Sequence, residues 1–217
     1  MANPVTLTAP RGPVSEAYRT LRTNLLFSNP DNPARALVVT SPSPDEGASM
    51  VAANLAVTMA QGGRNTVLVD CDLRRPRQHE IWGVSNEVGL TNLVGGDVKS
   101  PPFQDVGVEG LHFLPSGPLP PNPADLLGSR RMEEIIAALR KKAEVLLFDA
   151  PPVIAVTDSA LLAANLDGVL LVVRAGHTRR EHVERARDLL ERLNIRIVGI
   201  ALTDAEIEAG MRGYYIE

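Results

Sequence analysis

The sequence feature that most constrains the fold is an apolar run followed by a small-residue loop and a helical pattern, over residues 36–61. Ala36–Thr40 is apolar and has the length of a strand, and the loop after it is rich in Ser, Pro, Asp, Glu and Gly. From Ser49 the apolar residues recur with helical spacing. In such strand–loop–helix units, small loop residues and the amino-terminal end of the helix bind phosphate. The sequence therefore predicts a phosphate-binding loop.

This loop departs from the usual phosphate-loop pattern at one position. The pattern ends Gly-Lys-Ser/Thr, whereas this loop ends with Gly47, Ala48 and Ser49. A lysine there contacts the β- and γ-phosphates and stabilises the negative charge that develops on the transferred phosphoryl group. Its loss weakens binding by about 1.5–3 kcal/mol and slows the chemistry by about 10²–10³-fold. We expect impaired chemistry more than lost binding, with Arg74 and Arg75 as the nearest replacement cations.

Composition limits the class of protein. At 217 residues and 44% hydrophobic, the chain can bury one full core, which favours a single α/β domain. A net charge of −4 and a pI near 5.6 argue against a nucleic-acid-coating protein. The single cysteine, Cys71, excludes an internal disulfide and suits a reducing compartment. With no signal-peptide pattern and no apolar run of membrane-spanning length, we expect a cytoplasmic protein. From the charge, we expect that it binds no nucleic acid.

Apolar runs of strand length alternate with helical patterns along the chain. We predict an extended N-terminal arm over residues 1–13, one domain over 14–203 and a C-terminal tail over 204–217. The predicted strands are 36–40, 66–70, 111–115, 144–149, 169–173 and 195–202. This alternation is typical of a mostly parallel sheet with right-handed crossovers and helices on both faces.

Three acidic residues follow or end predicted strands. Asp70 and Asp72 stand two residues apart at the end of one strand, and Asp149 ends a buried one. Ligands bind open parallel sheets at the carboxyl ends of their strands, where carboxylates suit a hard cation or act as a general base. Asp149 fits a Walker B acid, which orients Mg²⁺ and water. The alternative is that these residues only stabilise turns or cap helices.

A helix predicted from Val14 carries a charged surface. Glu16, Arg19 and Arg22 are spaced three apart and therefore share one face. A solvated face with local ion pairs is one interpretation, and a subunit contact is the other.

Several segments together resemble the bacterial tyrosine kinases of capsular and exopolysaccharide synthesis, the cytoplasmic CapB/CpsD type. The resemblance covers about residues 14–202 and depends on EAYRTLRTNLLFS, TSPSPDEG-x-S, VAANLA, VLVDCDLRRP, PPNPADLL, FDAPPV and TDSALLAANLDGVLLVVRAG. It implies a P-loop NTPase fold like that of MinD and ParA, with ATP or ADP and Mg²⁺ bound at the Walker A, Walker A-prime and Walker B motifs.

The resemblance assigns roles residue by residue. Asp70 and Asp72 would be the Walker A-prime acids, acting as base and in the metal shell, and Asp149 the Walker B acid; these three are the implied catalytic residues. Ser49, Asp72 and Asp149 would hold Mg²⁺. The implied nucleotide contacts are Asp45, Glu46, Gly47, Ala48, Ser49, Met50 and Thr203.

The resemblance also implies an assembly. The family's E-x-x-R-x-x-R motif falls on Glu16, Arg19 and Arg22, which implies a ring of identical subunits. Tyr214 and Tyr215 stand where the family carries tyrosines that are phosphorylated between neighbouring subunits. The implied partner is a membrane-embedded polysaccharide chain-length regulator, a Wzz-like activator, which would hold the chain at the inner face of the membrane. The alternative for the tyrosines is an ordinary frayed terminus.

Two departures from the family affect nucleotide contacts. Ala48 replaces the Walker A lysine, and Thr203 stands where relatives carry an asparagine that reads adenine. One hypothesis is a tyrosine autokinase that regulates polysaccharide synthesis and export with strongly reduced activity. A second is a pseudokinase that serves as a scaffold for the export complex. A third, a ParA/MinD-like ATPase, is disfavoured because the loop also lacks the signature lysine of those ATPases.

Overall fold

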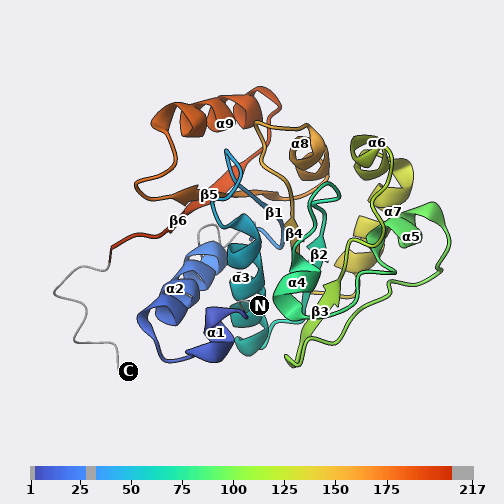
Figure 1. The fold of residues 1–217 in the computed structure, drawn as a ribbon, viewed down its shortest axis with the longest axis horizontal. Coiled ribbons are helices and arrows are strands. Elements are labelled where there is room, and N and C mark those ends of the chain that lie inside the picture. Colours follow the sequence, from blue (N-terminus) through green and yellow to red (C-terminus); the bar gives the residue numbers. More distant parts are fainter. Residues whose placement is uncertain (1–2, 28–32, 207–217) are drawn as a thin grey trace.

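The computed structural model describes residues 3–27 and 33–206, which form a sheet covered by helices (Figure 1). The sheet has six strands in the order β3-β2-β4-β1-β5-β6, and every pairing between neighbours is parallel. The strands are β1 (Ala36–Thr40), β2 (Thr66–Asp70), β3 (Leu111–Leu114), β4 (Val145–Asp149), β5 (Gly168–Arg174) and β6 (Ile197–Thr203). The predicted α/β class is confirmed, and the predicted mostly parallel sheet is entirely parallel among these strands.

The helices cover both faces of the sheet. They are α1 (Val5–Thr8), α2 (Pro13–Phe27), α3 (Ala48–Gln61), α4 (Gln78–Trp82), α5 (Leu90–Gly95), α6 (Pro123–Leu127), α7 (Arg130–Arg140), α8 (Asp158–Ala163) and α9 (Arg180–Arg192). Among the described residues, no helix combines the length and the hydropathy that crossing a bilayer requires.

Two hydrophobic cores lie on opposite faces of the sheet because side chains alternate along each strand. In β1, Val38 packs in the core that α7, α8 and α9 cover, whereas Leu37 and Val39 pack in the core under α2 and α3. Figure 1 shows the sheet between these two groups of helices. Strands β1, β2 and β4 are buried on both faces, which explains their continuous apolar sequences.

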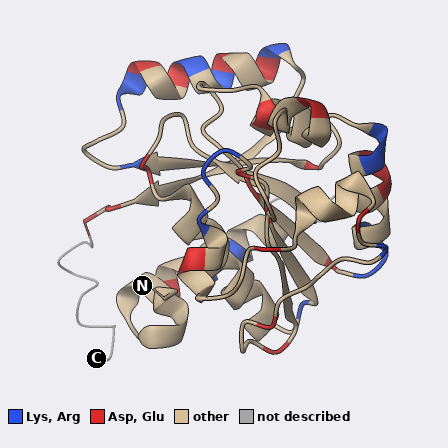
Figure 2. Cartoon of the chain, turned by 45° about the vertical axis from the view of Figure 1, so that its right-hand side comes forward, with Lys and Arg blue, Asp and Glu red and all other residues tan. Residues whose placement is uncertain are grey.

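Helix α9 illustrates how an amphipathic sequence covers one edge of this sheet. Its buried residues are Ala186 and Leu190, while ion pairs such as Arg180–Glu184, at 2.9 Å, lie on its exposed side. In Figure 2 the ribbon of this helix alternates between basic and acidic residues. Exposed pairs of this kind add little stability, so α9 is held mainly by its apolar stripe.

The prediction of an extended N-terminal arm was wrong for residues 5–8. These residues form α1, which packs on α3, and α2 already begins at Pro13. The backbone N–H and the hydroxyl of buried Thr6 both donate to Asn54 Oδ1, at 3.0 and 2.9 Å. Ser15 Oγ donates to the carbonyl of Ala9 at 2.7 Å. Polar contacts to a neighbouring helix therefore organise a segment whose prolines favour extended chain.

The charged face predicted on α2 makes contacts within its own chain. Arg19 pairs with Glu16 and donates to the carbonyl of Pro10 at 2.6 Å. Arg22 Nη1 donates at 2.8 Å to the carbonyl of Thr58, in the last turn of α3. These contacts fit the interpretation as local pairing, and the predicted subunit contact stays a prediction.

Removing Arg22 tests whether it stabilises the single chain. In Arg22→Ala, the Thr58 carbonyl loses a charged donor at the negative end of the α3 dipole. We expect the free energy of unfolding to fall by about 1 kcal/mol. Urea unfolding of dilute, monomeric protein measures this, with Arg130→Ala as control because the Arg130 side chain is 91% exposed. Equal stability of the two variants would show that Arg22 does not hold α2 against α3.

Candidate functional site

The loop between β1 and α3, residues 41–47, forms the first part of the site. It bends through two residues in the left-handed backbone region, Asp45 (φ 62°) and Gly47 (φ 86°). Glycine adopts this region freely, and aspartate is one of the few other residues that tolerate it. The carbonyl of Gly47 accepts the N–H of Val51 at 3.0 Å and so starts the hydrogen bonding of α3. The loop therefore leads directly into the first turn of a helix.

Two side chains from distant elements hold this loop. Ser43 Oγ lies 2.8 Å from His182 Nδ1 on α9. Thr203 Oγ1, at the end of β6, donates to the carbonyl of Glu46 at 3.1 Å. Thr203 therefore contacts the loop backbone, and it is not among the described residues that line the adjoining cavity.

A cavity of about 1030 Å³ opens beside the loop, at the carboxyl ends of the strands. Six of the predicted nucleotide contacts line it: Asp45, Glu46, Gly47, Ala48, Ser49 and Met50. The opposite walls come from residues 72–84 and 150–156. Its volume is that of a site for a molecule of nucleotide size. Ala48 contributes only a methyl group to this wall.

Two carboxylates meet at the ends of neighbouring strands. Asp70 of β2 and Asp149 of β4 are register partners, and both are buried. The oxygens of Asp70 accept the backbone N–H groups of Asp72 (3.2 Å) and Gln78 (3.0 Å). Asp149 Oδ2 accepts Gln78 Nε2 at 2.9 Å, whereas its Oδ1 is buried with no hydrogen-bond partner in the described structure. Asp149 thus keeps an unused buried acceptor.

Burial makes the ionised forms of both acids costly. It raises the pKa of Asp70 well above its usual range, and the neighbouring charge of Asp149 adds to the effect. Burial also raises the pKa of Asp149, against the lowering effect of the Gln78 and Ser49 side chains. Two carboxylates side by side in the protein interior favour binding of a cation or a proton.

The donor set fits a magnesium ion. Mg²⁺ is usually held by one or two carboxylates together with water and substrate phosphates. Asp149 Oδ1 is an unpaired acceptor, and Ser49 and Asp72 line the cavity next to it. In residues 3–27 and 33–206 no group of three or more His, Cys, Asp or Glu side chains is arranged to hold a metal by itself. Phosphate or water oxygens would therefore complete the coordination.

Asp72 also shapes the turn in which it lies. Its Oδ1 accepts the backbone N–H groups of Arg74 (3.2 Å) and Arg75 (2.9 Å). The interpretation of Asp72 as a turn residue therefore accounts for the contacts of Oδ1. The same side chain also lines the cavity. The two interpretations are compatible, because one carboxylate oxygen can serve each purpose.

Gln78 connects the site, and the sequence interpretation missed it. The first residue of α4, Gln78 is fully buried, and its Nε2 donates both to the carbonyl of Ser49 (2.8 Å) and to Asp149 (2.9 Å). Trp82 Nε1 donates to Gln78 Oε1 at 3.1 Å and fixes the orientation of the amide. A glutamine opening a short helix carries no sequence signal for this role.

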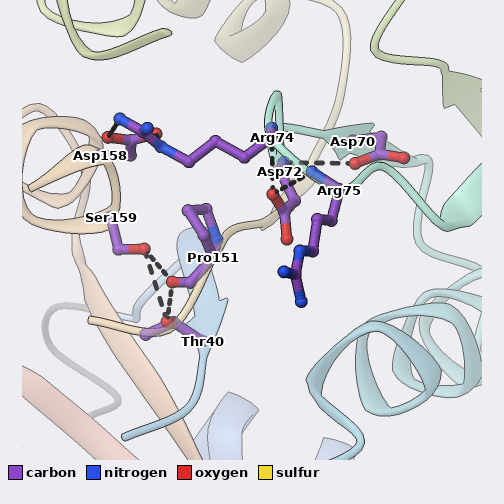
Figure 3. A network of polar contacts seen from close by, with 8 residues as sticks. All are labelled: Thr40, Asp70, Asp72, Arg74, Arg75, Pro151, Asp158 and Ser159. Carbon is purple, nitrogen blue, oxygen red and sulfur yellow. Dashed lines mark hydrogen bonds and ion pairs between the residues drawn. The ribbon is translucent and has the colours of Figure 1, made fainter. Parts of the chain in front are cut away.

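An ion pair joins the segment after β2 to α8 (Figure 3). Arg74 Nε and Nη2 donate to the two oxygens of Asp158, at 2.9 and 3.0 Å, and the Asp158 side chain is fully buried. The next residue, Ser159, donates to the carbonyl of Pro151, which Thr40 Oγ1 also approaches, at 2.6 Å. These contacts fix α8 against the ends of β1 and β4, and the sequence interpretation missed the role of Asp158.

Comparison with known proteins decides the family. A family model of the ParA group, described as NUBPL iron-transfer P-loop NTPase, matches residues 33–203. Tyrosine-protein kinase YwqD of Bacillus subtilis (strain 168) is 36% identical over 215 residues, which are 98% of this chain and 91% of that protein. The chain belongs to the bacterial tyrosine-protein kinase family.

Solved structures of kinase domains have the same fold. The kinase domain of Escherichia coli tyrosine kinase ETK superposes with a TM-score of 0.89 at 30% identity and covers 96% of this chain and 82% of that one. The chimerical protein CapA2B2 gives 0.87 at 34% identity, over 92% and 88% of the two chains. These results confirm the predicted resemblance and the P-loop NTPase fold.

The description of the matching family model mentions iron transfer, but the cysteine content of this chain does not provide the ligands of an iron–sulfur cluster. Iron–sulfur clusters are held by several cysteine thiolates. This chain has a single cysteine, Cys71, and it is buried in the core.

Proposed function

We propose that this chain is a cytoplasmic nucleotide-binding subunit of a tyrosine-kinase system that regulates capsular or exopolysaccharide synthesis and export, with strongly reduced phosphoryl transfer. Membership of the tyrosine-protein kinase family supports the class of reaction. The loop, the cavity and the buried acids support binding of ATP or ADP with Mg²⁺. The observation that carries the reduced activity is the methyl group of Ala48 where the phosphate-loop pattern has a lysine.

In this proposal the position of each residue determines its role. The loop and the first turn of α3 bind the phosphates, Ser49 and Asp149 would hold the metal directly, and Asp72 would contact it through a bound water, which leaves the free oxygen of Asp72 able to accept a proton. Bound Mg²⁺ would neutralise charge on the β- and γ-phosphates. Asp72 lines the cavity and accepts the proton of the tyrosine hydroxyl, whereas Asp70, whose oxygens accept backbone N–H groups, supports the loop.

The transferred group moves in one displacement. The tyrosine oxygen forms a bond to the γ-phosphorus while the bond from that phosphorus to the β–γ bridging oxygen breaks. ADP leaves with the electron pair, and the hydroxyl proton goes to Asp72. Without a lysine at position 48, the charge that develops on the phosphoryl group lacks one of its usual partners.

The acceptors and the assembly belong to the same proposal. Tyr214 and Tyr215 lie outside the described residues, and we assign them as acceptors from the family resemblance. Glu16, Arg19 and Arg22 are assigned to a ring contact between identical subunits on the same basis. The partner is a membrane-embedded polysaccharide chain-length regulator, which holds the subunit at the inner face of the membrane.

A scaffold without catalysis is the second candidate function. Ala48 favours it, because the change removes a contact of the transition state while the acids and the charged face of α2 are retained. Such a pseudokinase would bind nucleotide, assemble and dock on the membrane partner without labelling its tyrosines.

Calorimetric titration with ADP and ATP, in Mg²⁺ or in EDTA, tests the binding that both candidates share. We expect saturable binding that is stronger in Mg²⁺. Asp149→Asn should lose most of the Mg²⁺ dependence, because a neutral amide replaces the charged carboxylate whose Oδ1 is unpaired. Arg130→Ala is the control for removal of an exposed side chain. A chain that binds neither nucleotide would contradict both candidates.

A further inference from the structure

The cavity lacks a lysine, and no other part of this chain provides one. The lysines of the sequence are Lys99, Lys141 and Lys142, and all three lie in the described part of the chain. None of them lines the cavity. Lys141 and Lys142 follow α7 and precede β4, at the edge of the sheet opposite the strand ends that hold the acids. Any cation that this chain supplies to the terminal phosphates is therefore an arginine.

Among the described residues, three arginines line the cavity: Arg74, Arg75 and Arg77. Arg74 is already engaged, because its guanidinium pairs with both oxygens of Asp158. The Asp158 side chain is fully buried, so withdrawing Arg74 toward a ligand would leave a buried charge unpaired. Arg74 is therefore not available to bind a phosphate.

Arg75 is placed differently. Its backbone N–H is fixed by Asp72 Oδ1 at 2.9 Å, next to a proposed metal ligand. Within the described residues, its guanidinium has no hydrogen bond or ion pair, although it lines a cavity with several acids on its walls. Figure 3 shows Arg75 extending to the same side as the Asp72 carboxylate, whereas Arg74 extends away to Asp158.

We infer that Arg75 supplies the cation that contacts the terminal phosphates of the bound nucleotide in place of the missing lysine at position 48. The inference rests on the proposed function, since it assumes that the cavity binds ATP. A guanidinium presents a planar fork of N–H donors that fits phosphate oxygens, and it stays charged at every physiological pH. Its long side chain reaches the phosphates from the Asp72 side of the cavity.

Arg75 is a binding residue more than a replacement in the chemical step. A lysine at position 48 would extend from the first turn of α3, whereas Arg75 comes from the opposite wall. Stabilising the transferred group depends on donors placed where its charge develops. Arg75 therefore restores affinity for ATP. Because it contacts the γ-phosphate, which ADP lacks, removing the Arg75 side chain should weaken the binding of ATP more than the binding of ADP.

A double-mutant cycle over Arg75 and Ala48 tests this with a binding measurement. Calorimetry gives the Kd of Mg-ATP and Mg-ADP for the unmodified chain, Arg75→Ala, Ala48→Lys and the double variant. We expect Arg75→Ala to weaken ATP binding by about 10–100-fold and ADP binding clearly less. With Ala48→Lys present, the loss caused by Arg75→Ala should shrink severalfold, because the lysine covers the same phosphates.

Matched variants separate the contact from general effects of charge. Arg130→Ala removes one positive charge from an exposed site outside the cavity and should leave both Kd values unchanged. Arg75→Lys keeps the charge and should retain most of the ATP affinity. Thermal unfolding of each variant verifies folding, which should be preserved because the side chain of Arg75 has no partner to lose in the described part of the chain.

Three outcomes would overturn the inference. If the unmodified chain binds ATP and Arg75→Ala binds it equally well, Arg75 makes no such contact, while the proposed function stands. If Arg77→Ala causes the loss instead, the cation is Arg77. If no variant binds either nucleotide, the proposed function fails and the inference fails with it.

Discussion

Ala48→Lys is expected to raise phosphate incorporation at Tyr214 and Tyr215 by about 10²–10³-fold over the unmodified chain. The new ammonium group would extend from the first turn of α3 into the cavity, where Ala48 leaves only a methyl group. From there it would follow the charge that develops on the γ-phosphoryl group. Mass spectrometry after incubation with Mg-ATP measures the labelling of each tyrosine.

Two variants make this comparison specific. Ala48→Gln adds length without charge and should stay near the level of the unmodified chain. Adding Asp149→Asn to Ala48→Lys should abolish the gain, because the metal loses a ligand. Equal labelling with and without the lysine would show that an arginine already performs its role, and the enzyme interpretation would stand. No labelling in either form, measured with the activating partner present, would favour the scaffold.

Arg74→Ala is expected to lower the free energy of unfolding by about 2–3 kcal/mol. The variant leaves the carboxylate of Asp158 buried without the two donors that it has at 2.9 and 3.0 Å. The cost is less than for a fully enclosed pair, because the Arg74 side chain is 41% exposed and water can enter in its place. Urea unfolding measures the change.

Further variants separate the buried charge from lost packing. Arg130→Ala should change the free energy of unfolding by less than about 0.5 kcal/mol. Adding Asp158→Asn to Arg74→Ala removes the unpaired charge and should recover part of the loss. If Arg74→Ala were as stable as Arg130→Ala, the ion pair would not hold α8 in place.

The strands were predictable because the chain gives each of them a strong local signal. The apolar run predicted at 144–149 is found as β4 (Val145–Asp149), and charge before it and prolines after it set its ends. Helix α9 (Arg180–Arg192) has a local signal of the same strength, since Val183, Ala186 and Leu190 recur at helical spacing. Local sequence signals, an apolar run for β4 and helical spacing for α9, are enough to identify these elements without any knowledge of their neighbours.

Helix α1 was missed because its cause is tertiary. Four residues are too few to show a period, and the prolines around them favour extended chain. Its order comes from the contact of Thr6 with Asn54, forty-eight residues away. No local pattern could reveal that contact.

The residues of the site likewise fall into two groups, those that a local rule predicts and those whose roles depend on tertiary contacts. The meeting of Asp70 and Asp149 followed from the rule that parallel strands end at one edge of the sheet, and their register confirms that meeting. The roles of Gln78 and Asp158 could not be predicted, because a buried amide and a helix-opening acid look ordinary in sequence. Thr203 was predicted to contact nucleotide, and its hydroxyl bonds the loop backbone.

Helix α3 has different tasks at its two ends. Its first residues, Ala48 and Ser49, form the cavity wall, and the carbonyl of Thr58 near its other end is held by Arg22 of α2. A helix of 14 residues is a stiff rod about 21 Å long. If nucleotide binding shifts α3 along its axis, the shift reaches the face of α2 on which we propose that subunits associate. Thermodynamic reciprocity then requires association to change nucleotide affinity by the same factor as nucleotide changes association.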